Sequence, residues 1–138
     1  MFVRDLTKRT YAKEVLIRGP EDVFRLCRTL KRRKKEHFAV ILVNSRNAVI
    51  GFETVSIGSL NASIVHPREV FLPAIENRAG SLILVHNHPS GDPTPSEEDL
   101  AITKRLVEAG RMIGIEVLDH VIVTPKAHVS FKERNLLK

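Results

Sequence analysis

The stretch Leu82-Ile83-Leu84-Val85 decides the fold class of this chain. All four residues are apolar, so a strand formed by them must be covered on both faces, as in the centre of a sheet that lies between helices. Helices are expected on both sides of it in sequence, from Pro67 to about Arg78 and from about Ser96 to Ile113. The stretch therefore predicts an α/β domain built around a buried central strand.

Further strands and one more helix are expected outward from this centre. Phe38–Val43 and a strand around Ala48–Ile57 flank the turn cluster Asn44–Asn47, which predicts a hairpin. The remaining expectations are a short strand over Glu14–Arg18, a helix from Glu21, a strand over Ile115–Val123, and a strand with a short helical turn within Val129–Leu137. We expect one domain over residues 1–138, with its core at about 13–137 and a mixed β-sheet flanked by helices.

Composition narrows the class of protein. The chain has 138 residues, 43% hydrophobic and 28% charged, which are values of a folded globular domain and not of a disordered chain. Its single cysteine, Cys27, excludes an intramolecular disulfide framework and a zinc site built from cysteines. No apolar run approaches the roughly 18–20 residues of a membrane span, and the first residues do not resemble a signal peptide. We therefore expect a cytoplasmic protein without a membrane segment.

Positive charge is concentrated near the N-terminus. Residues 1–38 contain 12 basic and 5 acidic side chains, whereas the other hundred contain 10 and 11. The densest part is Lys31–Lys35, which could contact nucleic acid phosphates or an acidic protein surface. The alternative is local, because cations at the end of a helix complement its dipole. No aromatic residues lie between these cations to stack on bases.

A pair of histidines follows the central strand. His86 and His88 are two residues apart, so both imidazoles are expected on one face of the strand and Asn87 on the other. The carboxyl end of a buried strand is where α/β sheets commonly bind ligands, and two imidazoles can fill two positions on Zn²⁺. Taken alone, His-x-His is more often an ordinary strand end or turn.

Asp99 is the expected third ligand. Ser96 and Asp99 also match the capping box Ser-x-x-Asp, whose role is purely local. Thr94-Pro95 offers another helix start, with Thr94 as the N-cap and Glu97 reaching back, and this start would leave Ser96 and Asp99 free to face the histidines. Two histidines and one aspartate leave a tetrahedral position open, which is typical of catalytic zinc.

These residues resemble the JAMM motif of the JAB/MPN metalloprotease superfamily, and the wider pattern is similar to the bacterial RadC family. The similar segments are Leu60-Asn61-Ala62-Ser63, Val65-His66-Pro67-Arg68-Glu69-Val70-Phe71, His86–Asp99, Gly110-Arg111 and Leu118-Asp119-His120. The resemblance covers about residues 13–137. It implies the JAB/MPN fold, related to that of cytidine deaminases, and one Zn²⁺ per chain held by His86, His88 and Asp99.

The resemblance also implies two catalytic residues. A JAMM site needs a glutamate upstream, near the start of the strand after the first helix, and Glu36 occupies that place. It would accept a proton from water and return it to the leaving amine. Glu69 is the alternative for this role. Ser96 would donate a hydrogen bond to the oxyanion of the tetrahedral intermediate, and His120 is expected to be a structural histidine and not a fourth ligand.

The expected function is zinc-dependent hydrolysis of a peptide or isopeptide bond in an unidentified protein or peptide. One alternative is a RadC-type module that binds DNA or protein through Lys31–Lys35, with a DNA-repair or mobile-element association and little hydrolysis. Family members similar to this chain carry an additional helix-hairpin-helix-like region at the N-terminus, for which this short form has no room. A metal-dependent nuclease is a further alternative, although phosphodiester cleavage commonly uses paired metal ions.

Overall fold

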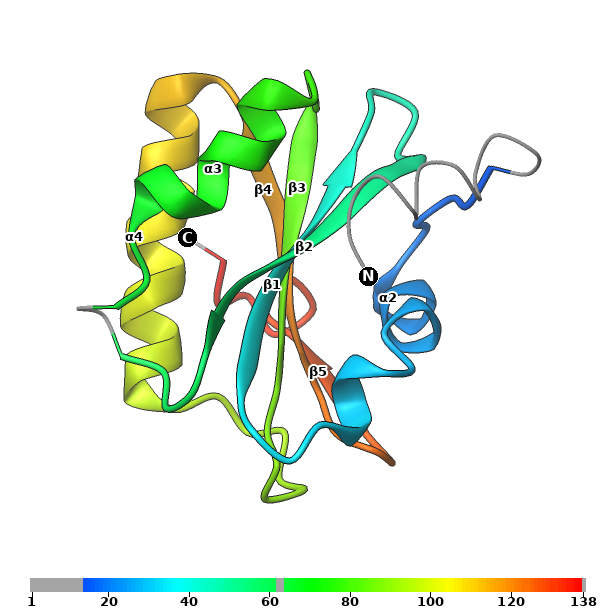
Figure 1. The fold of residues 1–138 in the computed structure, drawn as a ribbon, viewed down its shortest axis with the longest axis vertical. Helices are drawn as coiled ribbons and strands as arrows, with labels where there is room; N and C mark the ends of the chain where they lie inside the picture. The colour runs from blue at the N-terminus through cyan, green and yellow to red at the C-terminus, as the bar shows by residue number, and fades with distance from the viewer. Residues whose placement is uncertain (1–13, 62–63, 138) are drawn as a thin grey trace.

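A five-stranded sheet with the strand order β2-β1-β3-β4-β5 forms the middle of the molecule (Figure 1). The computed structural model describes residues 14–61 and 64–137. Its elements are α2 (Pro20–Leu26), the 3₁₀ helix η1 (Leu30–Arg32), β1 (His37–Val43), β2 (Val49–Ile57), α3 (Pro67–Glu76), β3 (Ser81–Asn87), α4 (Glu97–Ile113), β4 (Glu116–Val123) and β5 (His128–Ser130). The predicted α/β fold with a mixed sheet is confirmed.

β3 is the central strand, as its apolar sequence predicted. It pairs antiparallel with β1 and parallel with β4, and six of its seven residues are buried. The predicted hairpin is also present, because β1 and β2 pair antiparallel. Antiparallel pairing places the beginning of β1 beside the end of β3, where Phe38 pairs with His86.

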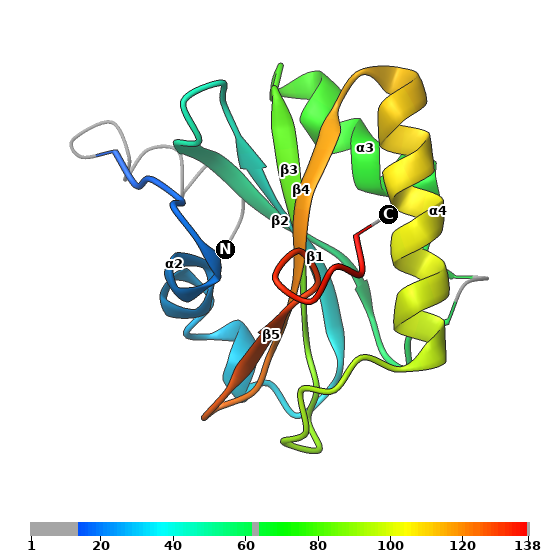
Figure 2. The same cartoon turned by 180° about the vertical axis from the view of Figure 1, so that it is seen from behind.

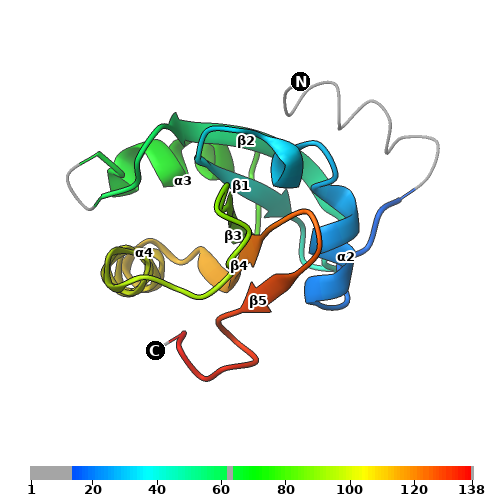
Figure 3. The same ribbon diagram turned by 90° about the horizontal axis from the view of Figure 1, so that it is seen from below.

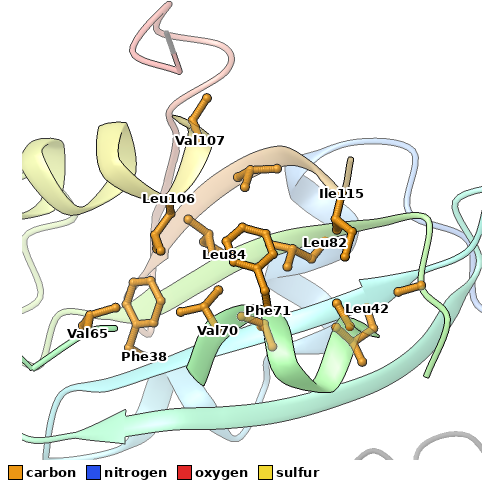
Figure 4. Packing of buried hydrophobic residues seen from close by; sticks show 14 of the residues in the cluster. Phe38, Leu42, Val65, Val70, Phe71, Leu82, Leu84, Leu106, Val107 and Ile115 are labelled. Carbon is orange, nitrogen blue, oxygen red and sulfur yellow. The ribbon is translucent and has the colours of Figure 1, made fainter. Parts of the chain in front are cut away.

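Helices cover both faces of the sheet, so the core has two layers. α3 and α4 lie on one face and α2 on the other, as the views from behind and below show (Figures 2 and 3). Alternate residues of β1 enter the two layers: Phe38, Val40 and Leu42 face α3 and α4, whereas Ala39, Ile41 and Val43 lie in the cluster that contains residues of α2. Figure 4 shows the first layer, where Phe71 and Leu106 meet Leu84.

Two expected elements near the N-terminus are shorter than predicted. The strand over Glu14–Arg18 is reduced to a single bridge between Leu16 and Ala48. The helix from Glu21 ends at Leu26, and turns lead into η1. Leu30 still lies in the same buried cluster as Val23 and Cys27, as the helical spacing predicted. Turns, and not a continuous helix, bring it there.

The two helices after the hairpin differ from prediction only at their ends. α3 ends at Glu76 rather than near Arg78, and Ile75, expected on the buried face, is 55% exposed. α4 ends at Ile113 as predicted, and its C-cap, Gly114, adopts the left-handed conformation (φ 87°) that glycine tolerates best. Within the described ranges, no helix combines the length and apolar character that crossing a bilayer requires.

Candidate metal centre

Three segments meet at the carboxyl end of β3. β3 contributes His86 and Asn87, His88 follows directly, the first turn of α4 contributes Asp99, and Glu36 directly precedes β1. Glu36 reaches this edge because Phe38 and His86 pair across the sheet. The loop between His88 and α4 lies at the same end of the sheet (Figure 1).

The two histidines and Asp99 form a compact donor set. Nε2 of His86 lies 2.9 Å from Nε2 of His88 and 3.1 Å from Oδ1 of Asp99, and Nε2 of His88 lies 3.1 Å from Oδ2 of Asp99. Donors at about 2.0–2.1 Å from a tetrahedral zinc ion stand roughly 3.3 Å apart. Neutral imidazole nitrogens and a carboxylate oxygen are ligands that Zn²⁺ accepts. The donor chemistry of these residues therefore fits a metal ion.

Glu36 completes a second, overlapping set. Its Oε2 lies 3.9 Å from Nε2 of His86 and 3.8 Å from Nε2 of His88, and its ligating atom lies within 4.8 Å of both histidine donors. The backbone N–H of Leu60 donates to Oε1 at 3.0 Å and holds the carboxylate in place. Glu36 therefore lies farther from the histidines than Asp99 does. A carboxylate at this greater distance is placed to accept a proton rather than to bind the metal.

The electrostatic environment favours positive charge between these groups. Burial alone would raise the pKa of Asp99, but hydrogen bonds from His86 and His88 hold it well below its usual range. Burial alone would lower the pKa of His88, but hydrogen bonds to the Asp99 carboxylate and the Asp92 carbonyl raise it. The same field that favours a charged His88 would favour a bound cation.

The N-cap of α4 lies two residues later than predicted, which changes the role of Ser96 and Asp99. The N-cap is Ser96 and not Thr94: Ser96 Oγ accepts from the N–H of Asp99 at 3.1 Å, and Asp99 Oδ2 accepts from the N–H of Ser96 at 2.8 Å. Thr94 donates to Asp92 instead. Capping and ligation are therefore not alternatives for Asp99, because the capping box orients the carboxylate while Oδ1 and Oδ2 still face the histidines.

Asn87 is a site residue that sequence reasoning did not assign. Its side chain points away from the two histidines, as predicted, and is fully buried. Oδ1 accepts from the N–H of His37 at 2.6 Å, and Nδ2 donates to the carbonyls of Arg33 and Lys35 at 3.1 and 3.0 Å. Asn87 thus fixes the segment that carries Glu36. An amide side chain within an otherwise apolar buried strand was the available signal.

A cleft of about 720 Å³ opens onto these groups. Its walls include Glu36, His88, Ser96 and Asp99, together with Lys34 and Lys35, the residues Ile57–Leu60, and Pro89 and Ser90. Glu69, the alternative proton acceptor, lies on the exposed side of α3 and is not among the described residues that line this cleft. A larger hollow of about 920 Å³ lies between α2 and β2, but none of the predicted site residues lines it.

The other histidine near the site is His120 of β4. It is fully buried, and its Nε2 lies 2.8 Å from Nδ1 of His86, the ring nitrogen that faces away from His88. Burial lowers the pKa of His120 well below its usual value, and the charge of His86 adds to this effect. The expected structural histidine is therefore in direct contact with the donor set.

Comparison with known proteins agrees with the resemblance in the sequence. The model of the RadC-like JAB domain matches residues 17–136. The chain is 55% identical over 132 residues to the UPF0758 protein TTE0897 of Caldanaerobacter subterraneus subsp. tengcongensis, a match that covers 95% of this chain and 57% of that protein. UPF0758 proteins of Alkaliphilus metalliredigens and Desulforamulus reducens are also 55% identical, over 122 and 124 residues, covering 88% and 89% of this chain and 53% and 55% of theirs. The chain thus spans little more than half the length of these relatives.

Proposed function

Because the chain belongs to the RadC-like JAB domain family, we propose that it is a zinc-dependent hydrolase of the JAMM type that cleaves a peptide or isopeptide bond with water. The observation that carries this proposal is the convergence of His86, His88 and Asp99, whose donor atoms lie 2.9–3.1 Å apart beside an open cleft. The single free Cys27 suits a reducing compartment, so a cytoplasmic location is part of the proposal.

Glu36 is the proposed general base and acid. Zinc at this site would lower the pKa of a coordinated water to about 7 and polarise a carbonyl group. Glu36 lies farther from the histidines than Asp99 does, and its carboxylate borders the cleft. There it would accept a proton from the attacking water and return it to the leaving amine. The hydrogen bond from Leu60 leaves Oε2 directed to the site.

Ser96 is the proposed donor to the oxyanion. Its Oγ accepts from the N–H of Asp99, and the hydroxyl proton is not used in that bond. Ser96 lines the cleft together with His88 and Asp99. One fixed donor to a developing oxyanion contributes on the order of 3 kcal/mol to transition-state stabilisation in other hydrolases.

A second candidate function is the binding of nucleic acid or an acidic protein surface. Lys34 and Lys35 line the cleft, so an anionic partner of the Lys31–Lys35 segment would lie next to the donor set. Lys31 is already engaged within the molecule, with Nζ 3.8 Å from the centre of the Phe24 ring. Affinity for DNA that falls steeply with salt and with charge removal at Lys34 and Lys35, but not in His86→Ala, would support this function.

Elemental analysis of the tag-free protein tests the metal site. We expect about one zinc per chain in the wild type, loss of zinc in Asp99→Ala, and retained zinc in Glu36→Gln. Glu97→Gln is the matched control, because Glu97 is an exposed acid in the same helical turn. Zinc retained in Asp99→Ala but lost in Glu36→Gln would assign the third ligand to Glu36 instead.

Hydrolysis is tested with the same variants. Glu36→Gln should hold zinc and lose cleavage of a peptide library that the wild-type protein cleaves. Unchanged cleavage in this variant would exclude Glu36 as the proton acceptor, and Glu69→Gln would then be compared. Cleavage of plasmid DNA, dependent on a divalent metal, would favour a nuclease over a peptidase.

A further inference from the structure

A line of buried hydrogen bonds leads from His86 back to Asp99. Nδ1 of His86 lies 2.8 Å from Nε2 of His120, and Nδ1 of His120 lies 2.5 Å from Oγ1 of Thr103. Oγ1 of Thr103 lies 2.7 Å from the backbone carbonyl oxygen of Asp99. His86, His120 and Thr103 are each no more than 1% exposed. The line thus joins two proposed metal ligands through the interior, on the side away from the cleft.

The proton positions along this line follow from its last member. A carbonyl oxygen only accepts, so Thr103 donates its single hydroxyl proton to Asp99 and must accept from Nδ1–H of His120. His120 lies between the rings of Phe131 and Phe38, with ring centres 4.4 and 5.6 Å away, where an uncharged imidazole is favoured. A neutral imidazole has one proton, so Nε2 of His120 is an acceptor.

The acceptor fixes the tautomer of His86. Since Nε2 of His120 accepts, Nδ1 of His86 must carry the proton that is donated. A histidine that ligates a metal is neutral, so a zinc-binding His86 would have Nε2 unprotonated, with its lone pair directed toward His88 and Asp99. This is the form of histidine that can bind a metal through Nε2. The interior hydrogen bonds alone select this tautomer. In the metal-free protein, Nε2 of His86 can instead carry a second proton and donate it to Asp99.

We propose that His120 and Thr103 are positioning residues of the metal centre, which hold His86 in its ligating tautomer and tie the first turn of α4 to β3 and β4. The inference rests on the proposed function, because it takes His86 and Asp99 as ligands. It also excludes His120 as a fourth ligand, since its Nε2 is directed to the far nitrogen of His86. Partners of this kind typically account for 10–100-fold in metal affinity.

Zinc affinity of the whole chain, measured by competition with a chromophoric chelator, tests the proposal. His120→Phe keeps a ring between Phe38 and Phe131 but has no acceptor, and we expect affinity to fall 10–100-fold. His120→Gln, which returns an acceptor near the position of Nε2, should recover most of it. Circular dichroism of each metal-free variant verifies the fold. Folded His120→Phe with wild-type affinity would overturn the proposal.

Thr103 offers a finer pair of variants. Thr103→Val keeps the shape of the side chain and removes the hydroxyl that accepts from His120, so zinc affinity should fall by several-fold. Thr103→Ser keeps the hydroxyl and should bind zinc as the wild type does. Equal affinities in Thr103→Val and Thr103→Ser would remove Thr103 from the proposal.

Imidazole nitrogen NMR of the metal-free wild-type protein reads the tautomer directly. The proposal expects the proton of His120 on Nδ1, with Nε2 unprotonated. A proton on Nε2 would reverse the hydrogen bonds between Thr103, His120 and His86 and overturn the proposal, even if zinc binds. Absence of zinc binding in the wild type would instead overturn the proposed function, and the positioning role with it.

Discussion

Individual buried polar side chains decide how the candidate metal centre is assembled. The carboxylate of Asp99 has three partners at once, because the N–H of Ser96 and the imidazole of His88 both contact its Oδ2 while His86 contacts Oδ1. Asn87 stabilises the opposite wall of the cleft. Its side chain makes three hydrogen bonds to the backbone on either side of Glu36. Asp99 thus links the two histidines to the start of α4, and Asn87 links the end of β3 to the segment before β1.

Replacing Asn87 should destabilise the protein. Asn87→Ala leaves one N–H and two carbonyl groups beside the site without their partner. Unsatisfied buried groups cost about 1–3 kcal/mol each, and solvent entry would offset part of this. We expect the free energy of unfolding in urea to fall by about 2–4 kcal/mol. Ser59→Ala, at an exposed position beside the same cleft, is the comparison variant, and an equally small loss in both would contradict the role of Asn87.

Cys27 should make stability depend on pH in the alkaline range. Burial raises the pKa of its thiol from the ordinary value of 9.0 to about 12. Between these values the unfolded chain releases the thiol proton and the folded chain keeps it, so stability falls as pH rises above 9. The loss attributable to Cys27 at pH 10 is about 1.4 kcal/mol. Urea unfolding of Cys27→Ala should lack this component, and parallel pH curves for the two proteins would contradict the expectation.

At the scale of elements, α4 connects the site to the core. Its first turn provides Asp99, its buried face provides Ile102 and Leu106 to the core layer, and Thr103 lies between them. The capping box at one end fixes the carboxylate, and a tight turn at the other leads into β4, which carries His120. A substitution that shifts either end of α4 should therefore also shift the position of Asp99 or His120.

The Ser96 cap allows stability and activity to be separated. Ser96→Ala should lower the free energy of unfolding by about 1 kcal/mol, whereas Ser96→Gly should lower it by only a few tenths, because glycine is tolerated at an N-cap. Both variants lack the hydroxyl that would donate to the oxyanion, so both should lose activity to the same extent. Activity that follows stability across the two variants would assign Ser96 a structural role alone.

Gly110 should not tolerate alanine, although it lies within a helix. A Cβ atom at this position would stand 2.4 Å from the backbone oxygen of Ile115 and 3.3 Å from the ring of Phe71. This clash must exceed the roughly 1 kcal/mol that alanine gains over glycine in a helix. We expect Gly110→Ala to lower the melting temperature. Ala101→Gly, at an exposed position of α4, measures the propensity term separately, and a more stable Gly110→Ala would contradict the clash.

At the scale of the whole molecule, the sheet brings together residues that are far apart in the chain. β1, β3 and β4 are neighbours, so Glu36, His86 and His120 meet although they are separated by up to 84 positions. Two buried layers hold these strands in place, one under α3 and α4 and one under α2. The candidate metal centre lies at one end of this frame, and its donor residues come from β3, the segment after it and α4.

Zinc should therefore stabilise the whole domain. A ligand at 100 times its dissociation constant adds about 2.7 kcal/mol to the free energy of unfolding, which corresponds to a rise of roughly 10 °C in melting temperature for a domain of this size. Adding a chelator should reverse the rise. His88→Ala should show no zinc-dependent shift, and a shift equal to that of the wild type would place zinc elsewhere.

The sequence by itself determined the strands of the sheet and the central place of β3, although the strand expected over Glu14–Arg18 is only a single bridge. Apolar runs and helical spacing are local, so Leu82–Val85 and the hairpin could be predicted without knowledge of the fold. The resemblance to the JAMM motif predicted His86, His88 and Asp99 as ligands, and the structure brings their donor atoms together. The sequence could not decide the start of α4, because Thr94 and Ser96 are both good N-caps. The hydrogen bonds in the structure decide it, since Thr94 binds Asp92 and Ser96 caps the helix.

Only the tertiary structure decided which other residues reach the site. Glu36 and Glu69 are both candidates in the sequence. The antiparallel pairing of β1 with β3 brings Glu36 to the histidines, whereas Glu69 lies on the exposed side of α3. The parallel pairing of β3 with β4 brings His120 within 2.8 Å of His86. Strand partners depend on the packing of the whole domain, and local sequence patterns do not contain that information.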